Sequence, residues 1–300
     1  WGTLNRYPDT LERRPARLAK ADAKVVTIAL NDVDPHANNQ DQQRFYAADV
    51  PIIGDVEASL PALLEGVRRA LDATARERIA QRAAAVRAAH DGLRQRARAQ
   101  AAYAWDASPV AVARLVAELG DVLAREDWAL VSPQQFVGRW PSRLWNFTKT
   151  YQFLGAQGAA GEGYAAPAAV GAALANKRLG RLSVAIQTDG DLMYQPGAYW
   201  TAAHHRIPLL AVMHNNRAYH QEVMHVQRIA NRRERGITNA HIGTTLADPG
   251  IDFAQMIKGL GVWTAGPIAH PGDLRPALVR ALAVVKRGEP ALIDVQTQPR

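Results

Sequence analysis

The chain of 300 residues contains no cysteine. This absence excludes disulfides, thiolate metal ligands and cysteine nucleophiles. No apolar run approaches the roughly 20 residues that a helix needs to cross a bilayer. The first ten residues, WGTLNRYPDT, lack the charged and apolar regions of a signal peptide. We therefore expect a cytoplasmic protein with no membrane partner.

The balance of charge is basic, with a formal net charge of +8 and a pI near 10, and this raises the question of a nucleic-acid partner. The arginines, however, are concentrated in two stretches, 76–98 and 228–235. In the first, Ile79, Val86 and Leu93 are seven residues apart, which predicts a helix with one narrow apolar stripe and a solvated basic surface. No aromatic residues alternate with these arginines to stack on bases. We expect no nucleic-acid partner.

The order of elements divides the chain into three parts. Residues 1–72 contain the β-rich runs KVVTIAL and DVPIIGD and then the helix-like VEASLPALLEGVRRAL, which together suggest the end of a partial βαβ domain. Residues 73–104 are predicted as a charged helical linker. From 105 to 300, apolar strands near 128, 181, 209 and 291 alternate with helices. This alternation predicts an α/β domain whose mostly parallel, doubly wound sheet has helices on both faces.

Small polar residues end two successive strands of the third part. RLSVAIQ runs into Asp189-Gly190, and LLAVMH, after a crossover helix, runs into Asn215-Asn216. Each pair alone is typical of an ordinary turn. In a βαβ unit, however, both strands point the same way, so Asp189 and Asn216 are expected to meet at one edge of the sheet, where ligands of such sheets bind. A carboxylate and an amide oxygen suit Mg²⁺, and Gly190 allows close approach of a phosphate.

These residues carry a family resemblance. The Asp-Gly and Asn-Asn pairs, with Asn216 27 residues after Asp189, resemble the cofactor motif of thiamine diphosphate (ThDP) enzymes of the acetolactate synthase and benzoylformate decarboxylase type. The stretches GYAAPAAVGAALA, DPGIDFAQMIKGLGV and GEPALIDVQTQP are similar to that family over residues 105–300. The resemblance implies a ThDP-binding fold, the cofactors ThDP and Mg²⁺, and a 2-oxo acid as substrate. Residues 1–72 resemble, more faintly, the end of the family's middle domain.

The resemblance also implies individual roles. Asp189, the side chain of Asn216 and the backbone carbonyl of Ala218 correspond to the Mg²⁺ ligands. The residues expected around the cofactor are Gly161, Glu162, Gly163, Tyr164, Thr188, Asp189, Gly190, Asp191, Asn216, Ala218 and Tyr219. His220, Gln221 and Glu222, just after the metal ligands, are candidates for substrate contact or proton transfer, because a histidine with a pKa near 6.5 serves at neutral pH.

The sequence departs from the family pattern in three ways. Thr188 stands where the family usually has glycine. Glu162 aligns with a bulky apolar residue under the cofactor, where a carboxylate would favour the thiazolium cation over its ylid. The family's activating glutamate belongs to an N-terminal pyrimidine-binding domain that the 300 residues do not contain. We therefore expect a fragment or one subunit of a split enzyme, in a homodimer or homotetramer, with the site at a subunit interface.

Several alternatives stay open from the residues alone. A non-catalytic ThDP- or nucleotide-binding module with a structural or regulatory role is the rival to a decarboxylase or carboligase. The histidines between 204 and 241 lack the spacing of a zinc site, so zinc is the less favoured metal. Arg228, Arg232, Arg233 and Arg235 are candidates for binding an anionic substrate, although a solvated loop is the favoured interpretation.

Overall fold

The computed structural model describes residues 5–6, 16–17, 20, 22–30, 48–132, 137–154 and 163–298. They fall into two compact units, within 1–88 and within 89–300.

The first unit contains the strands and helix predicted for its part of the chain. β3 (Val26–Ala29) and β4 (Val50–Ile53) form a parallel pair, and α1 (Val56–Ala70) follows β4 directly. The Asp55 carboxylate caps α1 by accepting a hydrogen bond of 2.8 Å from the Ala58 N–H. A short antiparallel pair, β1 (Asn5–Arg6) and β2 (Ala16–Arg17), was not predicted.

α2 (Ala73–Ala102) is the long charged helix that the sequence predicted, and it extends across the boundary between the units. Its apolar stripe is open to solvent, with Ile79, Val86 and Leu93 exposed by 38%, 63% and 58%. Neither α2 nor any other helix within the described ranges has an apolar stretch long enough to cross a membrane.

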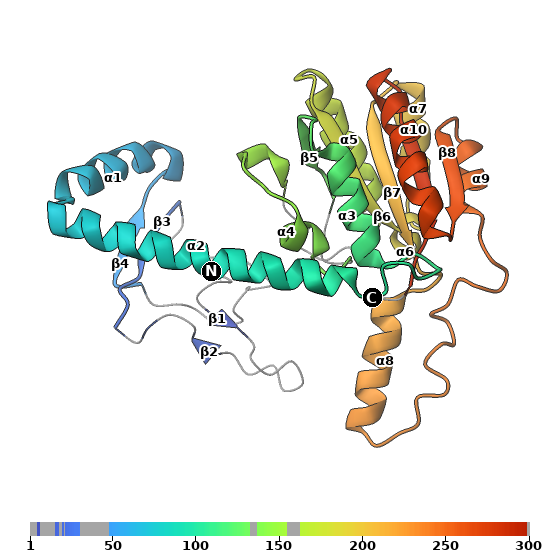
Figure 1. Ribbon diagram of the computed structural model, residues 1–300, viewed down its shortest axis with the longest axis horizontal. Helices are drawn as coiled ribbons and strands as arrows, with labels where there is room; N and C mark the ends of the chain where they lie inside the picture. The colour runs from blue at the N-terminus through green and yellow to red at the C-terminus, as the bar shows by residue number, and fades with distance from the viewer. Residues whose placement is uncertain are drawn as a thin grey trace. The chain divides into compact units, whose positions relative to one another are not determined.

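A five-stranded parallel sheet forms the centre of the second unit (Figure 1). Its strands, in the spatial order β5-β6-β7-β9-β8, are β5 (Trp128–Leu130), β6 (Leu182–Thr188), β7 (Leu209–Asn215), β9 (Ala291–Gln296) and β8 (Trp263–Ile268). The prediction of a parallel α/β sheet is confirmed, and all its neighbouring strands are parallel.

The edge strand β8 was missed from the sequence. Its stretch WTAGPI contains Gly266 and Pro267, which are unusual within strands, and its pairing with β9 is irregular between Ala265 and Ile268. Proline lacks an N–H for the sheet, so an edge is where a strand tolerates it.

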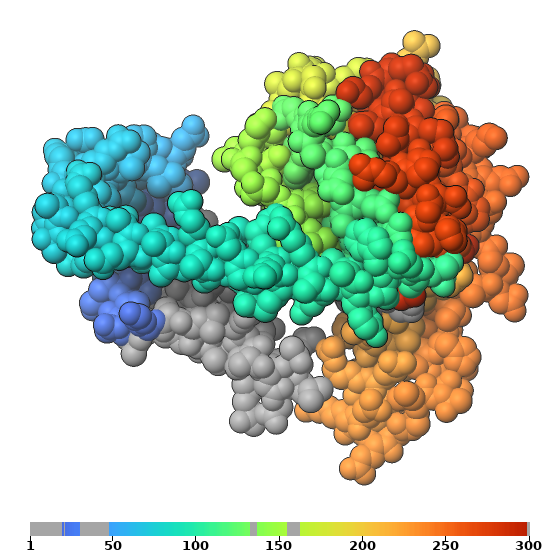
Figure 2. Space-filling view, viewed as in Figure 1, coloured from blue at the N-terminus to red at the C-terminus, as the bar shows by residue number. Residues whose placement is uncertain are grey.

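Helices cover both faces of the sheet, as a doubly wound fold requires. One face packs against α3 (Val112–Leu123), α4 (Trp140–Leu144) and α10 (Leu274–Lys286), and the other against α5 (Ala165–Lys177), α7 (Gly197–His204) and α9 (Phe253–Lys258). Figure 2 shows α3 and α10 side by side on the outer surface of this unit. Leu210 and Val212 of β7 face the first layer, whereas Ala211 and Met213 face the second. Burial on both faces explains the unbroken apolar run LLAVM.

Two helices begin at the carboxyl ends of the central strands. α6 (Asp189–Leu192) follows β6 at once, and α8 (His220–Arg232) starts five residues after the end of β7. Unlike the helices that cover the sheet, α8 contains no fully buried residue. Two 3₁₀ turns, η2 (Thr150–Gln152) and η3 (Pro271–Asp273), complete the elements of this unit.

Candidate functional site

The ends of β6 and β7 bring Asp189 and Asn216 to one place. The two strands are adjacent and parallel, with Thr188 opposite His214 in the register. Asp189 follows β6 directly, and Asn216 follows β7 directly. Asp189 Oδ2 and Asn216 Oδ1 both accept hydrogen bonds from the Ala218 N–H, at 3.2 Å and 3.0 Å. The carboxylate and the amide oxygen therefore converge as the βαβ argument predicted.

A pocket of about 180 Å³ lies at this point. Predicted site residues from both strand ends line it: Thr188, Asp189, Gly190, Asp191, Asn216, Ala218, Tyr219, His220, Gln221 and Glu222. Tyr194 and His214 complete the lining, and neither was assigned to the site from the sequence. The first turn of α8 thus places all three candidate catalytic residues beside the converging oxygens.

Asp189 is the most perturbed carboxyl of the pocket. It is 1% exposed and accepts hydrogen bonds from the Gly190 N–H at 2.9 Å and from the Ala218 N–H. Burial raises the pKa of Asp189 to about 6, although these backbone hydrogen bonds oppose the rise. The group is therefore ionised at neutral pH in a poorly solvated place, where a bound cation would stabilise it.

Asp191 holds the loop before α5 against the end of β6. Its Oδ1 accepts from the Gly163 N–H at 2.7 Å, and its Oδ2 accepts from the Ala165 N–H at 3.2 Å and from Gln187 Nε2 at 3.1 Å. Gly163 has a φ of +79°, and a Cβ there would lie 2.8 Å from the Cβ of Tyr194. Asp191 was predicted to line the diphosphate through its backbone, and the structure shows that its side chain positions the 163–165 segment.

The ring of Tyr219 leaves no room for a side chain at position 190. A Cβ at this position would lie 2.6 Å from Tyr219 Cδ1, so the Tyr219 ring packs directly over the glycine. Tyr219 also contacts Tyr194 edge to face, with ring centroids 6.3 Å apart. The two tyrosines therefore form an aromatic wall of the pocket.

Buried polar groups support the loop after β7. Asn215 donates to Asp294 Oδ1 at 2.9 Å and accepts from the Arg217 N–H at 3.2 Å. His214 Nδ1 lies 2.6 Å from Thr297 Oγ1, and its Nε2 lies 3.5 Å from Asn216 Nδ2. In the sequence, His214 is a polar residue that directly follows the apolar run LLAVM of β7. This signal could have marked it as a residue that supports the neighbouring Asn216.

Two of the predicted cofactor residues, Gly161 and Glu162, are outside the described residues, and with them the expectation that Glu162 lies under the thiazolium. Gly163 and Tyr164 are described but are not part of the pocket lining. Tyr164 precedes α5 and is 43% exposed.

The oxygen atoms of Asp189 and Asn216 are ligands of the kind that hard cations prefer. Within the described ranges, no three His, Asp or Glu side chains are grouped as a metal site. A cation at Asp189 would therefore take its other oxygens from the amide, the backbone and a bound ligand, which is typical of Mg²⁺.

Comparison with known proteins identifies the unit that holds this pocket. Residues 137–295 match the family described as thiamine pyrophosphate enzyme, C-terminal TPP binding domain. The chain belongs to this family. Thiamine pyrophosphate is the same compound as ThDP, and the matched region of this ThDP-enzyme chain includes both Asp189 and Asn216. The resemblance stated from their motif is therefore confirmed.

Curated relatives of this ThDP-enzyme chain are longer than the region that matches. A benzoylformate decarboxylase from Pseudomonas aeruginosa is 36% identical over 140 residues, which cover 47% of this chain and 24% of the relative. A Mycobacterium tuberculosis protein named as a putative acetolactate synthase large subunit, IlvX, is 31% identical over 133 residues, which cover 44% of this chain and 24% of that protein. The match thus spans about a quarter of each relative.

Solved structures give the same family. The ThDP-dependent 4-hydroxybenzoylformate decarboxylase of Rhodococcus jostii RHA1 is 27% identical with a TM-score of 0.53, and the match covers 65% of this chain and 34% of that one. The benzoylformate decarboxylase of Polynucleobacter necessarius has a TM-score of 0.54 at 21% identity, covering 65% of this chain and 34% of its own, and supports the fold alone.

Proposed function

We propose that the chain forms the diphosphate- and Mg²⁺-binding part of a ThDP-dependent enzyme that decarboxylates a 2-oxo acid. The enzyme then releases an aldehyde or joins the remaining fragment to a second carbonyl compound. The observation that carries the proposal is the convergence of Asp189 and Asn216 on the Ala218 N–H, within a TPP binding domain. The names of the curated relatives support this class of reaction.

The residues of the pocket fit the proposed cofactor and metal. Asp189, the Asn216 side chain and the Ala218 carbonyl would hold Mg²⁺, and the metal would neutralise the diphosphate. The buried carboxylate of Asp189 and the neighbouring amide oxygen of Asn216 support this assignment. Bound ThDP supplies the stabilisation of a carbanion, which protein side chains cannot provide by themselves. Tyr194 and Tyr219 would exclude water from the diphosphate side of the pocket.

The first turn of α8 would handle the substrate. His220, Gln221 and Glu222 line the pocket, and we assign them to substrate contact and proton transfer. Glu222 Oε2 lies 3.4 Å from His225 Nδ1, so His225 can hold this carboxylate in place. Arginines at the far end of the helix and beyond it, from Arg228 to Arg235, would attract an anionic substrate.

The proposed enzyme needs more than this chain. We propose that a pyrimidine-binding domain, in the same polypeptide or on a separate subunit, completes the site, and that the assembly is a cytoplasmic homodimer or homotetramer. That the match covers 24% of each curated relative supports a role for further domains.

The test is CO₂ release from a panel of 2-oxo acids by the native protein with its completing domain, with and without ThDP and Mg²⁺. We expect turnover of at least one acid that requires both cofactors and is lost in Asp189→Ala. Asp91→Ala, at a 71% exposed side chain on α2, is the matched control and should keep full activity. Cofactor binding without turnover of any acid would contradict the proposal and favour a non-catalytic module.

A further inference from the structure

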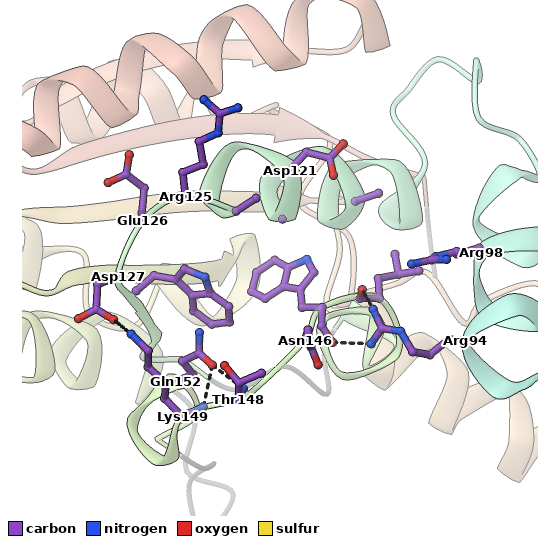
Figure 3. A pocket seen from close by; sticks show the side chains of 16 residues that line it. Arg94, Arg98, Asp121, Arg125, Glu126, Asp127, Asn146, Thr148, Lys149 and Gln152 are labelled. Atoms are coloured by element: carbon purple, nitrogen blue, oxygen red, sulfur yellow. Dashed lines mark hydrogen bonds and ion pairs between the residues drawn. The ribbon is translucent and has the colours of Figure 1, made fainter. Parts of the chain in front are cut away.

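A second and larger cavity lies at the other edge of the sheet in the same unit. Its volume is about 740 Å³, and it is an open cavity lined by the last turns of α2, the end of α3, the start of β5 and the segment 144–152 (Figure 3). It shares no lining residue with the ThDP pocket. Trp128, in its wall, is paired with the first residue of β6, whereas Asp189 follows the last. At about 3.3 Å per residue, the seven-residue strand separates the two sites by roughly 20 Å.

The unbalanced charge of this cavity is positive. Each of its carboxylates has a cation nearby. Asp121 Oδ2 lies 3.7 Å from Arg275 Nη1, Glu126 Oε1 lies 2.8 Å from Lys286 Nζ, and Asp127 Oδ1 lies 2.8 Å from Lys149 Nζ.

Two arginines of α2 have no such acidic partner within the described ranges. Arg94 donates to the uncharged carbonyl oxygens of Trp145 and Leu144, at 2.9 Å and 2.8 Å. Arg98, one helical turn further along α2, has no hydrogen bond or ion pair among the residues that the structure describes. The charges of Arg94 and Arg98 are therefore not neutralised by the protein.

The side-chain amide of Gln152 lines the same cavity. Gln152 is 6% exposed, and its Oε1 accepts hydrogen bonds from the Thr148 N–H at 2.7 Å and the Lys149 N–H at 3.0 Å. These two bonds fix the amide, so Nε2 faces away from the loop that holds Oε1 (Figure 3). No hydrogen bond from Nε2 is found within the described part of the chain, and Nε2 is not one of the buried polar atoms left without a partner there. The atom is therefore accessible from the cavity and can donate a hydrogen bond to a ligand.

We propose that this cavity binds a small phosphate ester of about nucleotide size. Its volume is within the range of roughly 300–1,000 Å³ that is usual for small-molecule sites. Phosphate oxygens would accept hydrogen bonds from the Arg98 guanidinium and from Gln152 Nε2, and they would balance the free positive charge of α2. Arg94 keeps the end of α4 in place, so that the phosphate side of the cavity is already formed. The site is independent of the ThDP pocket and of the reaction proposed there.

The probe is adenosine 5′-monophosphate (AMP), titrated calorimetrically into the full chain, with adenosine and inorganic phosphate measured in parallel. We expect AMP to bind at least about tenfold more tightly than adenosine, because the phosphate makes the charged hydrogen bonds. Arg98→Gln should weaken AMP binding by about tenfold or more. Gln152→Glu keeps oxygens for the two loop N–H groups but replaces the donor with a negative oxygen, and it should weaken binding at least as much.

Two controls make the result decisive. Arg96→Gln removes a charge from the same helix outside the cavity and should leave the Kd of AMP unchanged. Asp189→Ala should also leave it unchanged, which separates this cavity from the ThDP pocket. The proposal is overturned if AMP fails to bind at millimolar concentration, if adenosine binds equally well, or if Asp189→Ala abolishes binding. Equal binding to wild type, Arg98→Gln and Gln152→Glu, all folded by circular dichroism, would overturn it as well.

Discussion

Asp189 and Asn216 accept hydrogen bonds from the same backbone N–H, that of Ala218. Asp189 follows β6 and Asn216 follows β7, so the shared donor holds one side-chain oxygen from each strand end close to the other. The arrangement places two side-chain oxygens together at the point where we propose that Mg²⁺ binds. Substitutions at these residues and at the side chains that pack around them should therefore change stability or cofactor affinity in specific ways.

Replacement of Gly190 tests the contact with Tyr219. In Gly190→Ala, the new Cβ would lie 2.6 Å from Tyr219 Cδ1 and 2.7 Å from Cε1, so the ring has to move. We expect the free energy of unfolding, measured in urea, to fall by about 1–3 kcal/mol. Gly197→Ala is the control, because its Cβ would meet nothing within 4 Å, and it should be nearly neutral.

A double-mutant cycle identifies the cause of that loss. Tyr219→Ala removes the ring, so Gly190→Ala should be much less destabilising in the Tyr219→Ala background than in wild type. Equal effects in both backgrounds would show that Tyr219 is not what excludes a side chain at 190.

Asp191 is expected to be a major stabilising residue. Its carboxylate accepts from the Gly163 and Ala165 N–H groups and from Gln187 Nε2 in a buried place. Asp191→Ala leaves these donors without an acceptor, and we expect a loss of about 2–4 kcal/mol in the free energy of unfolding. Asp191→Asn retains one acceptor oxygen and should lose less. Equal losses for the two variants would argue against the hydrogen bonds as the cause.

The strands and the contacts of the site differ in how far the sequence predicts them. The strands at 182 and 209 were predicted because buried parallel strands are continuous apolar runs, and the meeting of Asp189 with Asn216 followed from the βαβ geometry alone. The role of Asp191 was not predictable, because Gly163 and Ala165 lie 28 and 26 residues away. His214 and Thr297 are 83 residues apart and meet only in the folded sheet. Strand β8 was missed because Gly266 and Pro267 interrupt the apolar run that would otherwise indicate a strand.

Asp294 should make stability depend on pH. Burial raises its pKa from 3.8 to about 6, and its Oδ2 is buried with no hydrogen-bond partner among the described residues. The folded state therefore binds a proton more tightly than the unfolded state. This contribution to stability is complete below about pH 4 and is lost as the pH rises through 6.

The measurement for Asp294 is urea unfolding of wild type and Asp294→Asn between about pH 8 and pH 4.5. As the pH falls, wild type should gain stability relative to Asp294→Asn, by on the order of 1–3 kcal/mol. The difference between the two proteins isolates this group, because other carboxyls, including Asp189, titrate in both. A difference that is constant with pH would show that Asp294 does not titrate in this range.

Thr297 is expected to act on the metal site through His214. Thr297→Val removes the hydroxyl that lies 2.6 Å from His214 Nδ1, and so removes one of the contacts that orient the imidazole beside Asn216. We expect Mg²⁺-dependent ThDP affinity to fall by about tenfold, as is usual for residues that position metal ligands. Thr264→Val on the edge strand β8 is the isosteric control and should leave the affinity unchanged. Unchanged affinity in Thr297→Val, with the fold intact, would remove His214 from the support of the site.

The most direct measurement is a calorimetric titration of ThDP into the protein with Mg²⁺ and with EDTA, for wild type, Asp189→Ala, Asn216→Ala and Asp91→Ala. If Asp189 and Asn216 hold Mg²⁺ against the diphosphate, wild type and Asp91→Ala bind ThDP only with Mg²⁺, and the other two variants lose more than about 100-fold in affinity while remaining folded. If Asp189→Ala binds ThDP with wild-type affinity and the same dependence on Mg²⁺, the two residues do not form the metal site.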